Sequence, residues 1–357
     1  MVGLSVRALA QSARAGGYVP LAADLFCDLD THDAAERCVR IAGDLERGLA
    51  WAELSAALEE LEAEPAAVGV VYGSGFEDRP ELIDRIGERW PVYGNSAKAI
   101  KEVKDPDRLA ELCNACGIPH PGWSETPPGD GWLRKRLGGS GGSHVGAESA
   151  GGHYWQERVE GEPVAALVLA DGTRAMVLGL SAQWADPLTT APFRYGGAVR
   201  PVELPERAAD QMVAAARKIV EAAGLIGLNS VDFLVGPGGW YLLEVNPRPG
   251  ATLDIFRPAE GSLFELHVTA CGGRLPTAVP KFSSRGAAAR IVYAARDVKC
   301  VPQLDWPDWC ADRQPAGTEV RAGEPLCTVI AEAASAAEAR RLVEIRGTAV
   351  AASLGAV

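Results

Sequence analysis

The sequence predicts an α/β protein in which a parallel-sheet region precedes a larger α+β region built on antiparallel strands. Strand and helix patterns alternate over residues 1–94, which indicates a parallel sheet. Two apolar runs flank a Gly/Pro turn between residues 229 and 254, which is the pattern of a β-hairpin. Short strand patterns dominate from Arg285 onward, so we expect a small β-rich segment at the end.

The first part alternates regularly between the two element types. The expected elements are a helix at 4–15, a strand at 18–26, a helix at 53–62 and strands at 67–72 and 91–93. Ligands of such sheets bind at the carboxyl ends of strands, so loops 28–31 and 73–77 are expected at a substrate-side edge. Ordinary βα turns are the alternative for both. Only residues 2–4 precede the first helix, so either the first strand is very short or the true start lies upstream.

Residues 95–118 predict two helices that meet at Asp105-Pro106 and stop at Gly117. Lys98 either points toward phosphates or is a solvated helix lysine, and we favour the second reading. Residues 118–121 are expected to be extended.

Residues 131–145 combine a strand with a glycine-rich loop. In strand geometry Lys135 shares a face with two leucines, whereas Arg134 and Arg136 share the other, so Lys135 is expected to point inward. The loop that follows offers backbone N–H groups without side-chain obstruction, as phosphate binding requires. Its residues are Gly139, Ser140, Gly141, Gly142 and Ser143. It is neither a P-loop nor a dinucleotide fingerprint, because the required motifs are absent.

A charged connection at 157–162 joins two strands, and taken alone it reads as a turn. A strand at 176–184 precedes a polar loop at 193–198, in which Arg194 and the aromatic residues either bind substrate or pack on the surface. The pattern at 205–224 predicts an amphipathic helix with proline at its start and glycine at its end.

The hairpin carries the strongest chemical signal. If residues 236–240 form its loop, Val235 faces Tyr241 and Asp232 faces Glu244. Asn246 lies on the same face as Glu244. Opposed carboxylates repel each other, and with an amide oxygen they suit Mg²⁺. Arg248 follows and can reach a phosphoryl oxygen, whereas a solvent-facing hairpin is the bland alternative.

Beyond the hairpin, a loop at Asp254 becomes a helix that ends near Cys271, and His267 is expected to pack on it. Asp254 and Arg257 either face a substrate or pair with neighbours. Short strands follow from Arg285, with a helix at 335–346.

Composition describes an ordinary globular protein of 357 residues, with 47% hydrophobic and 23% charged residues. A net charge of −12 argues against nucleic acid, and no apolar run reaches membrane-spanning length. Eight scattered cysteines without a leader are expected to be reduced cytoplasmic thiols. The pair Cys113 and Cys116 lacks a second pair, and no histidines stand at zinc-ligand spacing.

The segment EVNPRPG at 244–250, preceded by a strand aspartate, resembles the metal-binding signature of the ATP-grasp superfamily of ligases. The resemblance covers about residues 1–330 and implies one or two Mg²⁺ ions (Mn²⁺ as a substitute) and ATP as cofactors. Metal ligands would be Asp232, Glu244 and Asn246, and Arg248 and Lys135 would act on the transferred phosphoryl group. Nucleotide contacts would come from Lys135, Gly139, Ser140, Gly141, Gly142, Glu157, Arg158, Val159 and Glu162, with Glu162 on the ribose.

The resemblance also implies an ATP-grasp fold with ATP between two antiparallel sheets. The expected parts are a pre-ATP-grasp domain at 1–94, an ATP-grasp domain at 95–280 with a lid lobe near 120–165, and a C-terminal β-rich segment at 281–357. The layout is similar to carboligases related to biotin carboxylase, but the sequence shows no biotin-attachment domain.

By resemblance, the activity would be ATP-dependent amide formation between a carboxylate and an amine through an acyl phosphate. Relatives of this kind add glutamate-type groups to C1-carrier coenzymes. The expected partners are small molecules, without nucleic acid or membrane, and the chain is expected to be cytoplasmic, with a homodimer as the candidate assembly. A phosphotransferase and a non-catalytic nucleotide-binding protein are the alternatives.

Overall fold

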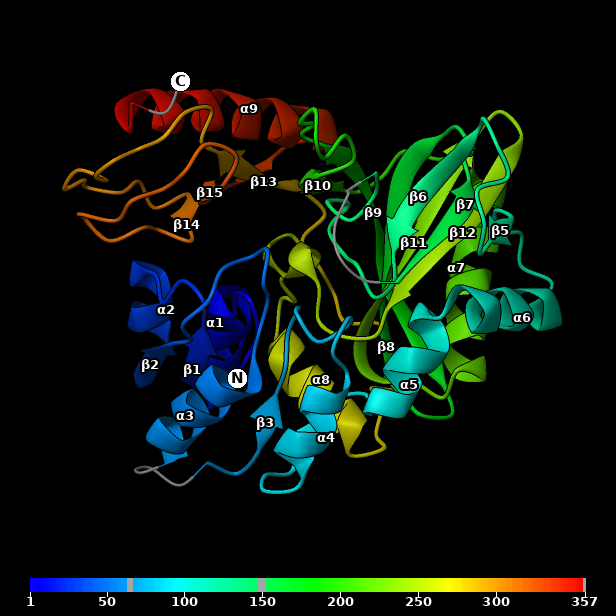
Figure 1. Cartoon of the computed structure of the whole chain (residues 1–357), viewed down its shortest axis with the longest axis horizontal. Helices are drawn as coiled ribbons and strands as arrows, with labels where there is room; N and C mark the ends of the chain where they lie inside the picture. Colours follow the sequence, from blue (N-terminus) through cyan, green and yellow to red (C-terminus); the bar gives the residue numbers. More distant parts are fainter. Residues whose placement is uncertain (63–66, 147–151, 356–357) are drawn as a thin grey trace.

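The computed structural model describes residues 1–62, 67–146 and 152–355 of the chain (Figure 1). Four sheets are present in these ranges: two parallel two-stranded sheets, an antiparallel three-stranded sheet and an eight-stranded antiparallel sheet. This arrangement confirms the expected mixed α/β class.

The N-terminal part forms the blue and cyan half of the molecule in Figure 1. Its elements are α1 (Arg7–Ala15), β1 (Leu21–Asp24), α2 (Leu29–Ala34), β2 (Arg37–Arg40), α3 (Trp51–Glu62), β3 (Val70–Val71), α4 (Glu81–Gly87) and β4 (Val92–Tyr93). Val2 forms parallel bridges to both Ala23 and Tyr72, so a very short first strand joins the two parallel pairs. The strand β2 is not expected from the sequence, because its polar residues are only half-buried.

One expectation about the cysteines is wrong. Cys27 and Cys38 are joined by a disulfide, with their Cα atoms 6.1 Å apart. The eleven-residue separation in sequence gives no sign of this, because the pairing depends on β1 and β2 lying side by side. The other six cysteines are free thiols, including Cys113 and Cys116 in one helix.

Two helices lead into the next part as predicted, α5 (Ala97–Lys104) and α6 (Pro106–Cys116). Ser96 caps the first, since its side chain accepts a hydrogen bond from the N–H of Ala99. Asp105 caps the second with Pro106 in the first turn, and Gly117 ends it in the left-handed conformation.

A three-stranded antiparallel sheet lies within residues 120–165, where a lid lobe is predicted, and we call this sheet the lid. It consists of β5 (Trp123–Ser124), β6 (Trp132–Arg136) and β7 (His153–Glu157), in the order β5-β7-β6. In Figure 1 it lies beside the outer edge of the large green sheet.

The eight-stranded sheet has the order β12-β11-β8-β9-β10-β13-β15-β14. Its strands are β8 (Glu162–Asp171), β9 (Ala175–Ala185), β10 (Tyr195–Arg200), β11 (Ile226–Gly236), β12 (Gly239–Asn246), β13 (Gly286–Tyr293), β14 (Cys310–Ala311) and β15 (Pro325–Ala333). The C-terminal strands therefore continue the central sheet, which they join through β10. The sequence predicts a loop at 193–198, where β10 begins.

Helices cover both faces of this sheet. The helix α7 (Glu206–Ala222) packs with alternate residues of β8 such as Val164, Ala166 and Val168. The intervening Leu167 and Leu169 pack on the opposite side with residues of α1 and α8 (Leu263–Cys271). Strand β8 is apolar on both faces because both faces are buried.

A long helix closes the far end of the sheet. The helix α9 (Ala336–Ser353) packs on β13 and β15, and it is the red helix at the top of Figure 1. It extends seven residues beyond the predicted end at Arg346. In the described ranges, no helix combines the length and apolarity that a membrane span requires.

Candidate active site

The hairpin of β11 and β12 brings the two predicted acidic residues together. Asp232 pairs with Glu244, as the sequence predicts. The pairing of Val235 with Tyr241 is wrong, because Val235 pairs with Trp240 around a shorter turn at Pro237 and Gly238. A β-bulge between Asp232 and Phe233 adds one residue to β12 and restores the expected register at the acids.

Asn246 joins the two carboxylates into one cluster. Its Nδ2 donates hydrogen bonds to Asp232 Oδ2 at 2.8 Å and to Glu244 Oε1 at 2.9 Å. Its Oδ1 accepts a hydrogen bond from Lys104 Nζ at 2.7 Å, and the same ammonium lies 3.8 Å from Glu244 Oε2. Three oxygen-bearing side chains therefore meet at one point on the sheet.

The surroundings of this cluster shift the pKa values of its two acids in opposite directions. Burial and the charge of Glu244 raise the pKa of Asp232. Burial also opposes ionisation of Glu244, but Lys104 and Lys135 outweigh it and lower the pKa of that carboxyl. Carboxylates that face each other across a strand pair repel each other, and a nearby cation compensates this repulsion. The two carboxylates are donors that fit Mg²⁺, whereas the amide oxygen of Asn246 is bonded to Lys104.

Lys104 is the site residue that the sequence pattern misses. It is the last residue of α5, and α5 packs against β12. The alternative considered for this helix, Lys98, is exposed to solvent. Helical spacing could have found Lys104, because it follows the buried Ile100 by four residues and so shares its face.

Lys135 occupies the inward position predicted for it. It lies on β6, is 5% exposed and donates a hydrogen bond to Gln156 Oε1 at 3.1 Å. Burial alone would lower the pKa of Lys135, but Tyr154, Glu244 and Asp232 outweigh it and raise that pKa. The lid thus places a permanent positive charge opposite the acids.

The glycine loop follows β6 and lies close to the loop before β10. The N–H of Tyr195 donates to Gly141 O at 3.0 Å. Gly142 has φ +73°, and a Cβ atom there would lie 1.7 Å from Phe193 O. A Cβ on Gly139 would lie 2.3 Å from the buried His144 ring. These close approaches explain why glycine occupies both positions. Residues 147–151, which follow the loop, lie outside the described residues.

Arg248 is held by a residue of the N-terminal part. Its Nε donates to Glu77 Oε1 at 2.7 Å, and Glu77 Oε2 accepts from the N–H groups of Gly75 and Phe76. Burial would raise the pKa of Glu77, but Arg248 and Lys104 outweigh it and lower that pKa. The loop at 73–77 therefore reaches the hairpin, as its place at the strand end predicts.

A cleft lies between the helices, the lid and the hairpin. Its lining includes Lys104 and Leu109 from the helices, Tyr154 and Gln156 from the lid, and Leu243 and Glu244 from β12. Gly139 and His144 from the glycine loop also line it. The lining mixes apolar side chains with charged ones, Lys104 and Glu244 among them, and nucleotide binding in this cleft stays a prediction.

The predicted adenine and ribose contacts lie along the connection from β7 to β8. Glu157, Arg158 and Glu162 are exposed, and Val159 is half-buried. The N–H of Arg158 donates to Gly131 O at 2.8 Å, so this donor is already bonded. Glu157 Oε2 accepts from the N–H of Gly122 at 3.1 Å. Their roles toward a nucleotide stay predictions.

Other polar residues considered for substrate are bonded within the chain. Arg194 donates to Asp186 and to the carbonyl of Gly323, and it lies 3.5 Å from the centre of the Tyr293 ring. These contacts support the packing alternative. Asp254 accepts from the buried Arg7, and the exposed Arg257 lies 3.9 Å from it.

Two buried carboxylates beside Lys104 and Lys135, with a glycine loop nearby, form an arrangement suited to phosphoryl transfer. Residues 109–252 match the ATP-grasp domain family. A formate-dependent phosphoribosylglycinamide formyltransferase from Synechocystis sp. is 30% identical over 159 residues, 42% of this chain and 39% of that protein. The family match places an ATP-grasp domain in the middle of the chain.

Solved structures show the same fold over nearly the whole chain. Biotin carboxylase from Campylobacter jejuni, described as a complex with β-γ-ATP, has a TM-score of 0.72 at 15% identity and covers 95% of this chain and 87% of its own. N5-carboxyaminoimidazole ribonucleotide synthetase from Thermotoga maritima has a TM-score of 0.67 at 14% identity, and the match covers 97% of this chain and 96% of that protein. The curated relatives, by contrast, are matched over only 25% and 39% of their length.

Proposed function

We propose that the chain is an ATP-dependent carboxylate–amine ligase that forms an amide through an acyl phosphate and releases ADP and phosphate. One observation carries this proposal. Asp232, Glu244 and Asn246 meet on one buried face of the hairpin, with two lysines beside them. The ATP-grasp fold supports placing ATP between the lid and the large sheet.

The residues would divide the work of phosphoryl transfer. Asp232, Glu244 and Asn246 would hold Mg²⁺, which supplies positive charge on the phosphate oxygens. Lys135 would neutralise further phosphate charge from the lid. Arg248, oriented by Glu77, would contact the transferred phosphoryl group. No protein nucleophile is required, because positioning and charge stabilisation dominate this chemistry.

The reaction would proceed in two steps. A carboxylate oxygen of the acid attacks the γ-phosphorus, the bond from that phosphorus to the bridging oxygen breaks, and ADP leaves. The amine nitrogen then attacks the acyl carbon, phosphate leaves with the attacking carboxylate oxygen, and the amine loses a proton to solvent. The glycine loop would cover the acyl phosphate, since water would hydrolyse it.

We also propose a division of the chain and a substrate class. Residues 95–280 would bind ATP, while residues 1–94 and 281–357 would frame the acceptor substrates beyond Arg248, in a cytoplasmic monomer or homodimer. The Glu77–Arg248 contact supports this division, because it joins the first part to the ATP site. The substrate class would be a glutamate-type group in C1-carrier coenzyme biosynthesis, by family resemblance. Formate belongs among the acids tested, since a relative is named for it.

The test is ADP release from Mg·ATP across a matrix of carboxylates and amines, with product masses measured in parallel. A ligase requires an acid and an amine together, and it gives a product whose mass equals their condensation. An acid labelled with ¹⁸O should then transfer one labelled oxygen to the released phosphate. A stable phosphorylated product would establish a phosphotransferase instead. ATP binding without turnover across the matrix would favour a non-catalytic nucleotide-binding protein.

A further inference from the structure

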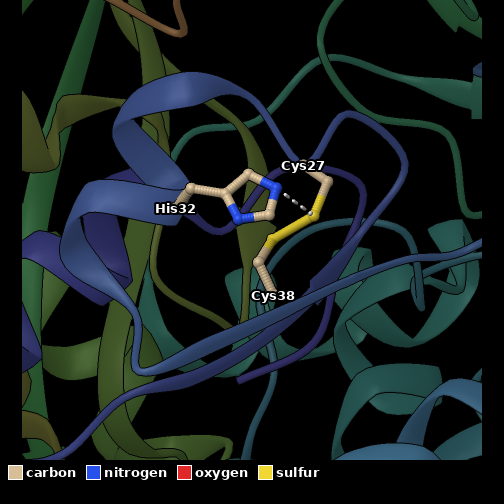
Figure 2. Close-up of side chains that lie close together, drawn as sticks. All are labelled: Cys27, His32 and Cys38. Carbon is tan, nitrogen blue, oxygen red and sulfur yellow. Dashed lines mark hydrogen bonds between the residues drawn. A yellow bond between two sulfur atoms is a disulfide. The ribbon is translucent and has the colours of Figure 1, made fainter.

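A cluster of soft metal-binding side chains lies in the N-terminal part, in elements separate from those that carry the ATP-site residues. Figure 2 shows Cys27, His32 and Cys38 converging from the loop after β1, from α2 and from β2. Their sulfur and nitrogen atoms all lie within 4.8 Å of one another. Cys27 Sγ lies 3.4 Å from His32 Nε2, and the two sulfurs form the disulfide.

The backbone around this cluster is fixed by contacts other than the disulfide. Cys27 adopts φ +49°, which is uncommon for a residue with a side chain. The buried Asp24 carboxylate holds this conformation by accepting the N–H groups of Phe26 at 3.0 Å and Cys27 at 2.6 Å. A strained conformation held by its surroundings is a feature of functional positions.

The positions of His32 and Cys38 are likewise fixed by contacts other than the disulfide. Asp28 caps α2 by accepting the N–H of Thr31 at 3.0 Å, and the N–H of His32 donates to Asp28 O at 3.0 Å. Cys38 pairs with Ala22 in the parallel ladder of β1 and β2. The three side chains would therefore stay together after the sulfur–sulfur bond is broken.

The separation of sulfur from nitrogen matches a tetrahedral metal ion, whereas the two bonded sulfurs would have to move apart after reduction. With Zn–S near 2.3 Å and Zn–N near 2.0–2.1 Å, a tetrahedral angle separates sulfur from nitrogen by roughly 3.6 Å. The observed separation is 3.4 Å. The Cα atoms of the two cysteines, 6.1 Å apart, allow both thiolates to face one ion. His32 is exposed, so a fourth ligand could come from water.

We propose that the reduced chain binds one Zn²⁺ ion through the Cys27 and Cys38 thiolates and His32. Two thiolates and an imidazole are a soft to borderline ligand set that selects zinc over magnesium. Reduction of the disulfide by a phosphine consumes one water and gives two thiols and a phosphine oxide. Binding then forms two Zn–S bonds and one Zn–N bond and releases the two thiol protons. The bound ion would tie α2 to β1 and β2.

Cobalt(II) is the probe, because thiolate coordination gives it an intense near-ultraviolet absorption band that oxygen ligands do not give. The full-length chain is reduced on an immobilised phosphine, separated from it and titrated with Co²⁺ and then Zn²⁺ without nucleotide. We expect one Co²⁺ per chain with the thiolate band, displaced by one equivalent of Zn²⁺. The oxidised chain should show no band. This readout is independent of the Mg·ATP site, whose ligands are oxygen atoms.

Variants separate the site from other thiols. Cys38→Ser should lower the affinity for Co²⁺ by more than roughly tenfold and weaken the band, and His32→Ala should keep the band while lowering the affinity. Cys300→Ser, at an exposed free cysteine, is the matched control and should behave as wild type. Circular dichroism of each variant establishes that it is folded. The proposal is overturned if the reduced wild-type chain gives no thiolate band with excess Co²⁺, or if the band survives unchanged in folded Cys38→Ser.

Discussion

At the scale of single residues, the active site is a balance of two carboxylates and two ammonium groups. The Lys104 ammonium lies where it neutralises Glu244 and bonds to Asn246 Oδ1. Lys135 adds positive charge from the lid. A divalent ion at Asp232 and Glu244 would therefore compete with Lys104 for the amide oxygen. This competition is testable.

Lys104→Met should make the protein more responsive to Mg²⁺. Loss of the ammonium leaves the two buried carboxylates less compensated, so Mg²⁺ without nucleotide should raise the melting temperature more in the variant than in wild type. Differential scanning fluorimetry with and without Mg²⁺ measures this. Lys101→Met, at an exposed position one turn earlier, is the control. Equal Mg²⁺ shifts in Lys104→Met and wild type would contradict the competition.

His267 should make stability depend on mildly acidic pH. It is 1% exposed, its Nδ1 accepts the N–H of Leu228 at 2.9 Å, and burial lowers its pKa to about 4. The unfolded pKa is near 6.5, so this stability is fully present above about pH 6.5 and is lost as pH falls toward 4. At pH 5 the loss should be roughly 2 kcal/mol.

The matched variant is His267→Asn, whose side-chain oxygen can still accept the N–H of Leu228. Urea unfolding between pH 7 and pH 4 measures the free energy of unfolding against pH. The slope should correspond to up to one fewer proton taken up on unfolding in the variant than in wild type. An unchanged slope would show that His267 is not the titrating group.

Some residues of the site follow from the sequence because their positions depend on local periodicity. Lys135 points inward because strand residues alternate, and Asp232 and Glu244 share a face for the same reason. The predicted turn is longer than the observed one, which shifts the pairing of Val235 by one residue, but the bulge in β12 restores the predicted pairing of the two acids. Lys104 was not predicted as a ligand-site residue, since its place depends on how α5 packs on β12.

At the scale of elements, the conformation of the glycine loop is fixed by its close backbone contact with the residues at the start of β10 and just before it. The carbonyl of Gly141 accepts from Tyr195, and Gly142 meets the backbone of Phe193. Backbone contacts at this distance leave no room for a side chain. The loop conformation thus depends on glycine rather than on its neighbours' side chains.

Gly142→Ala should weaken nucleotide binding without unfolding the protein. The new Cβ would lie 1.7 Å from Phe193 O, and the φ of +73° disfavours alanine, so the loop must move. We expect Kd for Mg·ATP to rise by roughly tenfold, which isothermal titration calorimetry would measure. Gly129→Ala, at another positive φ with no atom within 4 Å, is the control for backbone strain alone. If both variants bind Mg·ATP equally well, the close contact is irrelevant.

The limits of prediction at this scale are topological. Helices with clear caps, such as α5 and α6, were predicted almost to the residue. The sequence predicts a loop where the structure has β10, because Gly196 and Gly197 interrupt the strand pattern. Both glycines lie against Trp184. The C-terminal strands were recognised, but their entry into the central sheet depends on pairing between β10 and β13.

At the scale of the whole molecule, one buried arginine joins three distant segments. Arg7 of α1 is 3% exposed and bonds to Asp254 after the hairpin and to Asp312 near β14. Asp254 follows Arg248 in the chain, so this network ties the segment after the hairpin to the first helix and to the C-terminal strands. The sequence gives no sign of this network, because Asp254 and Asp312 lie 247 and 305 residues after Arg7.

Arg7→Leu should destabilise the whole protein. It leaves the buried carboxylate of Asp254 and the half-buried carboxylate of Asp312 without their shared cation, and removing one partner of a buried pair typically costs about 3–5 kcal/mol. Urea unfolding at neutral pH measures the loss. Arg108→Leu removes an exposed arginine that pairs with Glu111, and it should change stability by less than about 1 kcal/mol. Similar losses in the two variants would contradict the role of the buried network.

The most direct test of the ligase account is calorimetric binding of ATP to Glu244→Gln with and without Mg²⁺. Wild-type protein should bind ATP more tightly when Mg²⁺ is present, because the hairpin acids hold the ion on the phosphates. The variant should lose most of this Mg²⁺ dependence, by more than roughly tenfold in Kd, while Glu36→Gln, at an exposed acid, keeps it. If folded Glu244→Gln binds Mg·ATP as tightly as wild type, the hairpin is not the metal site and the proposed mechanism is wrong.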